Sequence, residues 1–227
     1  MLAVARDFDV EAAERDKDAV RVDIAKAVEN CIIANAGLTS ATRILDCGCG
    51  TGLVTLSMAP KAGFVVAVGA AAGMLGQLEA KIARQGLKNI RTINGLIEET
   101  SGPGSAFDLV VCTQTLAQVT GVERTISALR NCPEPEGVLA VSEMEIVGKE
   151  AGFGELSRTA IAATVTRIGF AVSGVFDAIE IHGGAGKDFF TKRYYVLLAT
   201  LADRPTSGRH CQRLGKREHD DSRRSFF

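Results

Sequence analysis

Three glycines at alternate positions, in Asp46-Cys47-Gly48-Cys49-Gly50-Thr51-Gly52, constrain this chain more than any other segment. The run follows an apolar stretch at 43–47 that predicts a short strand, and it precedes a helical pattern at 53–59. Glycines let a ligand approach the backbone closely, and the N-terminus of the following helix offers free N–H groups to a carboxylate or phosphate. The segment therefore predicts a ligand-binding turn between a strand and a helix, with an ordinary tight turn as the simpler alternative.

The rest of the chain predicts strands that alternate with helices. Expected strands lie at 43–47, 64–68, 90–93, 107–112 and 138–142, and expected helices at 53–59, 74–85, 122–130 and 158–168. Such alternation implies a parallel sheet with helices on both faces. Two last strands, near 172–181 and 193–202, are joined by a glycine-rich segment without a helix, so they predict an antiparallel hairpin at one end of the sheet.

Both ends of the chain carry further signals. At 9–30 a segment rich in alanine and charge predicts an amphipathic helix that ends at Gly37. Its apolar residues at helical spacing are Val20, Ile24, Ala27, Val28 and Cys31. A turn is expected at 133–137. Residues 1–202 are predicted to form one domain, and the polar, basic stretch 203–227 a disordered tail. The tail is either a weak anion- or nucleic-acid-binding arm or a solvated end without a role.

Composition narrows the classes of protein that this chain can be. With 227 residues, a net charge of −1, 5% aromatic residues and no tryptophan, it gives no sign of a nucleic-acid or membrane partner. Six cysteines without a Cys-x-x-Cys pair, and only three histidines, predict free thiols in a reducing setting and no metal site. Because no long apolar run occurs near the N-terminus, we expect a cytoplasmic protein.

The spacing of the glycines distinguishes between ligand classes. A dinucleotide fingerprint reads Gly-x-Gly-x-x-Gly, whereas this chain has Gly-x-Gly-x-Gly with an acid two residues before the first glycine. The segment also lacks the Gly-x-x-x-x-Gly-Lys pattern of a phosphate-binding loop. A nicotinamide-dependent oxidoreductase is further disfavoured because no Tyr-x-x-x-Lys pair is present.

At this point the chain resembles a known family. Its segment from Ile44 to Gly52 looks like motif I of class I S-adenosylmethionine-dependent methyltransferases. Four further pieces occur in that family's order, namely Met74-Leu75, the strand at 107–112, Gly137-Val138-Leu139 and Gly169-Phe170. The resemblance covers roughly residues 8–202. It implies an α/β, Rossmann-like class I methyltransferase fold, with seven mostly parallel strands, and S-adenosyl-L-methionine as the cofactor.

The resemblance also implies a set of cofactor-binding residues. These are Asp46, Gly48, Cys49, Gly50, Thr51, Gly52, Gly69, Ala70, Met74, Leu96, Ile97, Cys112 and Thr113. The three loop glycines would line the methionine part, Asp46 would reach its amino group directly or through water, and Met74 would pack near the adenine. Cys112 and Thr113 would face the reacting methyl, because ligands sit at the carboxyl ends of parallel strands. No catalytic residue is assigned, since methyl transfer depends mainly on positioning and on the cofactor's own reactivity.

Three departures from the family bear on activity. Gly69 stands where the family places an acid for the ribose hydroxyls, and Leu96 where it often places an acid for the adenine amine. Ala117-Gln118 replaces a frequent His-His pair. A lost charge-assisted hydrogen bond is worth about 1.5–3 kcal/mol, which weakens binding by one to two decades without touching the chemistry.

Two functions follow from these observations. The first is S-adenosylmethionine-dependent methyl transfer to a small-molecule acceptor, and the second is a catalytically degenerate methyltransferase fold that acts as a binding or interaction module. Three more groups have open roles. Phe8-Asp9 is either an aromatic-acid pair at the cofactor entrance or a loose segment, His182 either a base near the substrate or a solvated residue, and Cys112 is better interpreted as a packed thiol than a reactive one.

Overall fold

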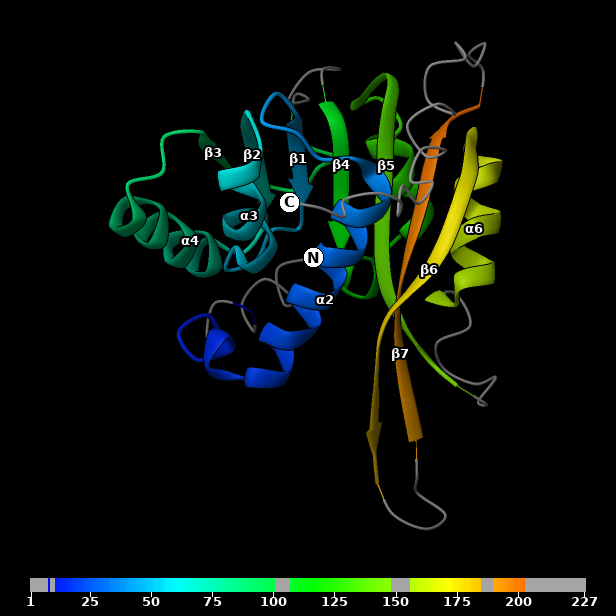
Figure 1. Ribbon diagram of the computed structural model, residues 1–227, viewed down its shortest axis with the longest axis horizontal. Coiled ribbons are helices and arrows are strands. Elements are labelled where there is room, and N and C mark those ends of the chain that lie inside the picture. Colours follow the sequence, from blue (N-terminus) through cyan, green and yellow to red (C-terminus); the bar gives the residue numbers. More distant parts are fainter. Residues whose placement is uncertain (1–7, 9–10, 101–106, 148–155, 185–189, 203–227) are drawn as a thin grey trace, which may run out of the picture.

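The computed structural model describes residues 8, 11–100, 107–147, 156–184 and 190–202, so the predicted tail at 203–227 lies outside the described residues. Seven strands form one sheet in the order β3-β2-β1-β4-β5-β7-β6 (Figure 1). Their bounds are β1 Arg43–Cys47, β2 Phe64–Gly69, β3 Ile90–Asn94, β4 Phe107–Thr113, β5 Pro133–Ile146, β6 Phe170–Gly183 and β7 Phe190–Leu201. The helices are α2 Ala19–Ala36, α3 Leu53–Met58, α4 Ala72–Gln85, α5 Val122–Leu129 and α6 Arg158–Arg167.

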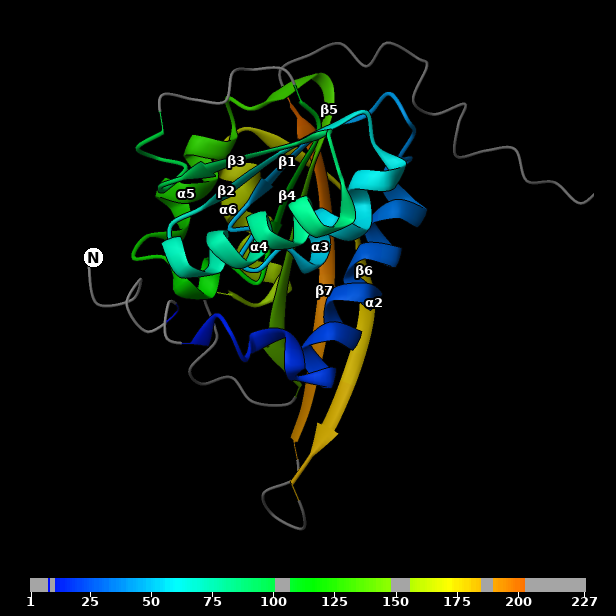
Figure 2. The ribbon, with the colours of Figure 1, turned by 90° about the vertical axis from the view of Figure 1, so that its left-hand side faces the viewer.

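Pairing within the sheet confirms the predicted α/β class. Strands β1 to β5 pair in parallel, while β7 runs antiparallel between β5 and β6. Strands β1 and β2 are almost continuously buried, because helices cover both faces of the parallel part. Helices α2, α3 and α4 pack on one face, and α5 and α6 on the other (Figure 2).

Helix α2 confirms the predicted N-terminal helix but begins later than expected. A short 3-10 turn at Arg15–Lys17 precedes it, and the Asp18 side chain then caps it by accepting from two backbone N–H groups. It ends at Gly37 with φ 74°, as predicted. The prediction was wrong for Val20, which is 50% exposed. This residue extends the buried stripe of Ile24, Val28 and Ile32 by one turn, beyond the elements that cover the rest of it.

The predicted turn at 133–137 is instead an irregular start of strand β5. Pro133 pairs with Phe107 and Val138 pairs with Leu109, so the intervening residues bulge out of register. A Cβ at Gly137 would stand 2.6 Å from the carbonyl oxygen of Phe107, which explains the glycine. The strand thus continues across the segment, with pairing to β4 at both flanks, even though its two prolines indicated a break.

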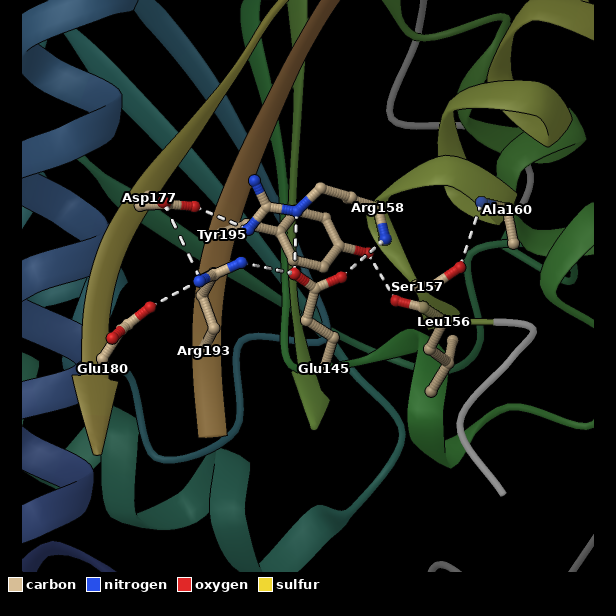
Figure 3. A network of polar contacts seen from close by, with 9 residues as sticks. All are labelled: Glu145, Leu156, Ser157, Arg158, Ala160, Asp177, Glu180, Arg193 and Tyr195. Carbon is tan, nitrogen blue, oxygen red and sulfur yellow. Dashed lines mark hydrogen bonds and ion pairs between the residues drawn. The ribbon is translucent and has the colours of Figure 1, made fainter. Parts of the chain in front are cut away.

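The C-terminal hairpin is confirmed and is longer than predicted. Strands β6 and β7 extend well past the ends of β1 to β4 (Figure 1), and β5 accompanies β7 as far as Ile146. Figure 3 shows two arginines, Arg158 and Arg193, tying this extension together through carboxylates on β5 and β6.

No helix in the part of the chain that the structure describes combines the length and the apolar character that crossing a membrane requires.

Candidate functional site

A cavity of about 190 Å³ opens at the carboxyl ends of the four strands β1 to β4. Its walls come from the loops after these strands, the start of α5 and the N-terminal segment. They are Phe8, Arg15, Cys47, Gly48, Gly50, Val68, Gly69, Ala70, Ala71, Met74, Gly95, Leu96, Ile97, Glu98, Gln114, Thr115, Gln118, Val119, Thr120, Gly121, Arg124 and Thr125. Chain order reverses between β1 and β4, and such a switch point is where open α/β sheets bind ligands.

The glycine loop forms the floor of the cavity, and its three glycines differ in what a side chain at each position would meet. All have positive φ angles, 77° at Gly48, 55° at Gly50 and 85° at Gly52. A Cβ at Gly48 would overlap the Thr115 side chain, and one at Gly52 would overlap Leu78. At Gly50 the nearest atom would be the Met74 sulfur, 3.7 Å away. Two of the glycines thus permit packing within the protein, whereas Gly50 leaves open space on the cavity side.

Asp46 lies directly behind this loop. It is 2% exposed, and burial raises the pKa of its carboxyl to about 6. Its Oδ2 accepts a 2.5 Å hydrogen bond from Thr55 Oγ1, while its Oδ1 has no hydrogen-bond partner among the residues described. A buried carboxylate oxygen without a donor is costly, so a ligand with an amino group at the loop would match it well.

The N-terminal segment closes one side of the cavity with an aromatic ring and a cation. The Arg15 guanidinium lies 5.4 Å from the centre of the Phe8 ring and pairs with Glu11 at 3.1 Å. Burial is the largest cause that lowers the pKa of Arg15, but an arginine stays protonated in proteins. It therefore presents a permanent positive charge to the cavity, suited to a carboxylate.

Asp16 fastens this segment to the glycine loop. Its carboxylate accepts a 2.5 Å hydrogen bond from Thr51 Oγ1 and pairs with the ammonium of Lys81. Lys81 also donates to the backbone oxygen of Thr51 at 2.7 Å. One acid and one base thus join the N-terminal segment, the loop and helix α4.

The wall between β2 and β3 carries less charge than the family pattern requires. Gly69 ends β2, and a Cβ there would stand 3.1 Å from Cys49 Sγ. Leu96 lines the cavity two residues before Glu98. Glu98 is the one acid among the described residues that line the cavity, and it accepts a 2.5 Å hydrogen bond from Thr125 Oγ1.

The wall after β4 is polar and conformationally unusual. Gln114 has a backbone φ of 52°, which is uncommon for residues other than glycine. Such backbone conformations cluster at functional sites. The backbone N–H of Gln114 donates to Ser142 O at 2.8 Å. Thr115 Oγ1 donates toward Cys47 O at 3.2 Å and Thr113 O at 3.0 Å. This wall therefore touches both the glycine loop and β5.

The structure brings seven of the thirteen predicted residues to the cavity surface. They are Gly48, Gly50, Gly69, Ala70, Met74, Leu96 and Ile97. The other six, Asp46, Cys49, Thr51, Gly52, Cys112 and Thr113, are not part of its lining. Cys112 is fully buried, in register with Cys47, because it belongs to the core of the sheet. The cavity is instead reached by Gln114 and Thr115, which are one and two residues beyond the end of β4. Contact of any of these residues with a cofactor stays a prediction.

Sequence reasoning missed the positions that a linear motif does not specify. Arg15, Glu98 and the pair Gln114 and Thr115 come from three separate segments, and only their convergence in space marks them. Phe8 of the predicted aromatic-acid pair does line the cavity, whereas Asp9 lies outside the described residues.

His182 lies away from this site. It is exposed near the end of β6, and its Nδ1 is 2.9 Å from Thr191 Oγ1 on β7. It is not among the cavity residues, so its position in the structure does not favour a role as a base there.

Comparison with known proteins agrees with this geometry. Residues 44–137 match the model of a methyltransferase domain family. The chain has the fold of class I methyltransferases, and its segment 44–137 is similar to methyltransferase domains. A curated relative of this chain is the ubiquinone biosynthesis O-methyltransferase of Rickettsia prowazekii (strain Madrid E), 28% identical over 123 residues. The match covers 54% of this chain and 48% of that protein, so the chain matches about half the relative's length.

Solved structures share the fold at low identity. A SAM-dependent methyltransferase from Aquifex aeolicus has a TM-score of 0.64 at 17% identity, over 83% of this chain and 97% of that one. The 4+2 cyclase SpnF has a TM-score of 0.62 at 17% identity, over 76% of this chain and 79% of that one. Likeness at this level of identity establishes only the architecture. It does not establish the reaction, because one fold hosts several chemistries.

Proposed function

We propose that this protein is a methyltransferase that transfers the methyl group of S-adenosyl-L-methionine to a small-molecule acceptor. The observation that carries the proposal is the open space at Gly50, in a cavity at the switch point of a methyltransferase fold. The motif order of the sequence, the matched domain model and the curated relative support it.

The residues around the cavity fit the chemical parts of this cofactor. Arg15 offers a guanidinium to a carboxylate. Asp46 lies behind the glycine loop and outside the cavity lining, so we propose that its Oδ1 accepts from an amino group through a bridging water. Met74 and Ile97 supply apolar surface for a purine, and Glu98 supplies a carboxylate on the same side. When bound, the cofactor supplies an activated methyl group on a sulfonium. The protein's own contribution is to bind, orient and shield it.

The acceptor is proposed to enter beside the wall after β4. Gln114, Thr115, Gln118 and Thr120 place amide and hydroxyl groups there, which can hydrogen-bond to a hydroxylated small molecule. The name of the Rickettsia relative, an O-methyltransferase of ubiquinone biosynthesis, favours an oxygen acceptor of this kind. A panel of hydroxylated aromatic compounds is therefore the first choice for substrate screening.

A second function is favoured by one specific observation. Both Gly69 and Leu96 line the cavity, at the two positions where the family's acids would hold the ribose and the adenine. A fold that has lost these acids would work as a binding or interaction module. Its affinity for the cofactor would then be negligible.

Calorimetric titration with S-adenosylmethionine distinguishes the two functions. The test compares the wild type with Gly69→Asp, which restores the acid at a position where a Cβ needs only a small shift of Cys49. Ala72→Asp is the matched control, because it adds the same charge at an exposed residue outside the cavity lining. We expect micromolar binding by the wild type, binding about tenfold tighter by Gly69→Asp, and no gain in the control.

The other outcomes are equally decisive. Binding by Gly69→Asp alone would show a degenerate site and favour the interaction module. Binding by neither protein would refute the cofactor assignment. Where the wild type binds, release of S-adenosylhomocysteine in the presence of the hydroxylated panel tests the transfer itself.

A further inference from the structure

A carboxylate is buried next to the cavity without lining it. Glu143 on β5 is 1% exposed and is not among the cavity residues. Its Oε1 accepts a 2.6 Å hydrogen bond from the backbone N–H of Leu116. The N–H groups of Thr115 and Ala117 lie near enough to the carboxylate to favour its ionised form. Three consecutive amides of one segment therefore act on a single acid.

That segment is the wall of the cavity after β4. Gln114, Thr115 and Gln118 face the cavity from it. The Thr115 side chain occupies the space that a Cβ at Gly48 would need, and its Oγ1 reaches the backbone oxygens of Cys47 and Gly48. A displacement of the segment would therefore change the contacts that Thr115 makes with the glycine loop.

We propose that Glu143 is a positioning residue for the cofactor, whose ionised carboxylate holds the segment after β4 against the glycine loop and so shapes the binding cavity. The proposal rests on the proposed function, because it assumes that the cavity takes S-adenosylmethionine. It assigns Glu143 no contact with the cofactor. Its effect passes through the backbone at 115–117 and through Thr115.

The pKa of Glu143 lies near neutral pH, so its charge changes within a pH range in which binding can be measured. Burial raises the pKa of its carboxyl to about 7, although the backbone N–H groups of Leu116, Thr115 and Ala117 oppose this shift. The titratable group that faces it across the sheet is Tyr195 on β7, in register with it, and burial and the nearby acids raise the pKa of that phenol. Glu145 and Arg158 act on the same tyrosine. Protonation of Glu143 converts an acceptor-only group into one with a donor, which holds fewer N–H groups.

The test measures affinity for S-adenosylmethionine between about pH 6 and pH 8. It compares the wild type with Glu143→Gln and Glu143→Asp at each pH, so that the cofactor's own titration cancels. We expect Glu143→Gln to bind about tenfold more weakly at the upper end, with the wild-type advantage vanishing at the lower end. Glu143→Asp keeps a carboxylate and should retain part of that advantage.

Glu145→Gln is the matched control on the same strand. The Glu145 carboxylate bonds to Arg158 and Arg193 rather than to the cavity wall, so this variant should keep the wild-type affinity and pH profile. An equal loss in the control would overturn the proposal, because it would show a general effect of charge in β5.

Amide hydrogen exchange in the cofactor-free protein supplies an independent measurement. The amides of Thr115, Leu116 and Ala117 should exchange at least about tenfold faster in Glu143→Gln than in the wild type at the same pH. Unchanged exchange and affinity, in a wild type that binds the cofactor, would overturn this proposal alone. A wild type that does not bind the cofactor would overturn the proposed function and this inference together.

Discussion

The two ends of the sheet handle charge in opposite ways. Around the cavity, Asp46 and Glu143 are buried, and burial raises the pKa of both carboxyls. At the hairpin, Arg193 on β7 and Arg158 at the start of α6 are partly exposed and meet several carboxylates within 4 Å (Figure 3). The cavity end thus keeps groups that cost stability, whereas the hairpin end uses paired charges that cost little. Such a division is expected where binding demands buried polar groups and a scaffold has to offset them.

The largest effect is expected at the glycine loop, where stability and binding can be separated. Gly48→Ala forces a Cβ into Thr115 at a φ of 77°, and should lower the free energy of unfolding by about 2–4 kcal/mol. Gly50→Ala meets only Met74 at 3.7 Å, so it should cost about 1 kcal/mol and still abolish cofactor binding. Urea denaturation and cofactor titration of both variants check this. Equal losses of stability would contradict it.

The next largest effect is a dependence of stability on pH. The pKa of Glu143 is raised in the folded state from 4.5 to about 7, so its stabilising contribution is complete below about pH 4.5 and is lost as pH rises through 7. Relative to the wild type, Glu143→Gln should therefore gain about 3 kcal/mol between about pH 4 and pH 8. Denaturant titrations at the two pH values measure this. A constant difference would show that the carboxyl titrates normally in the folded protein.

Asp46 should add a second, lower window to the same profile. Burial raises the pKa of Asp46 from 3.8 to about 6, so its contribution is lost as pH rises from about 4 to 6. Because the pKa of Asp46 in the folded state is lower than that of Glu143, the stability of Asp46→Asn relative to the wild type should rise at lower pH than that of Glu143→Gln does. Overlapping midpoints for the two variants would sink this ordering.

A smaller effect is expected in the hairpin. Arg158 bonds to Glu145 at 2.8 Å and Asp177 at 2.6 Å, and its guanidinium lies 5.5 Å from the centre of the Tyr195 ring. Because the Arg158 side chain is partly exposed, Arg158→Gln should lower stability by only about 1 kcal/mol and leave cofactor affinity unchanged. Thermal denaturation at low and high salt, with a parallel cofactor titration, checks both statements. A loss of affinity would show that the two ends of the sheet are coupled.

The smallest change in stability is expected for an exposed ion pair outside both the cavity and the hairpin. Arg167 and Glu123 form an ion pair between α6 and α5, with side chains 58% and 57% exposed. Removing it with Arg167→Gln should change stability by less than about 0.5 kcal/mol, because solvent and salt screen such a pair. The same denaturation assay applies, and a larger change would mean that surface pairs contribute more here than in the hairpin network.

Most of the fold could be predicted because its signals are local. The alternation of apolar runs with helical patterns predicted every strand of the sheet, and Gly37 marked a helix end that the structure confirms. The failures have physical reasons as well. Val20 follows the helical period yet stays 50% exposed, and 133–137 stays in β5 because β4 pairs with its flanks.

The candidate site could be predicted only where one segment supplies it. Gly48 and Gly50 of the glycine loop, together with Met74 and Leu96, come from segments that the sequence pattern singles out, and these four reach the cavity. Arg15 and Glu143 carry no motif, since each matters through groups distant in the chain. Nor does spacing tell that Cys112 is buried in the sheet while Gln114 reaches the cavity.

By itself, the sequence determined the order of elements, the α/β class and the place of the ligand-binding turn, because hydrophobic period and glycine conformation act over a few residues. Tertiary structure alone decided which glycine faces the cavity, which carboxylates are buried and which segment holds the cavity wall. Those properties depend on contacts between residues that are far apart in the chain, such as Glu143 with Leu116 and Asp16 with Thr51. Burial and electrostatic environment are set only when these segments meet.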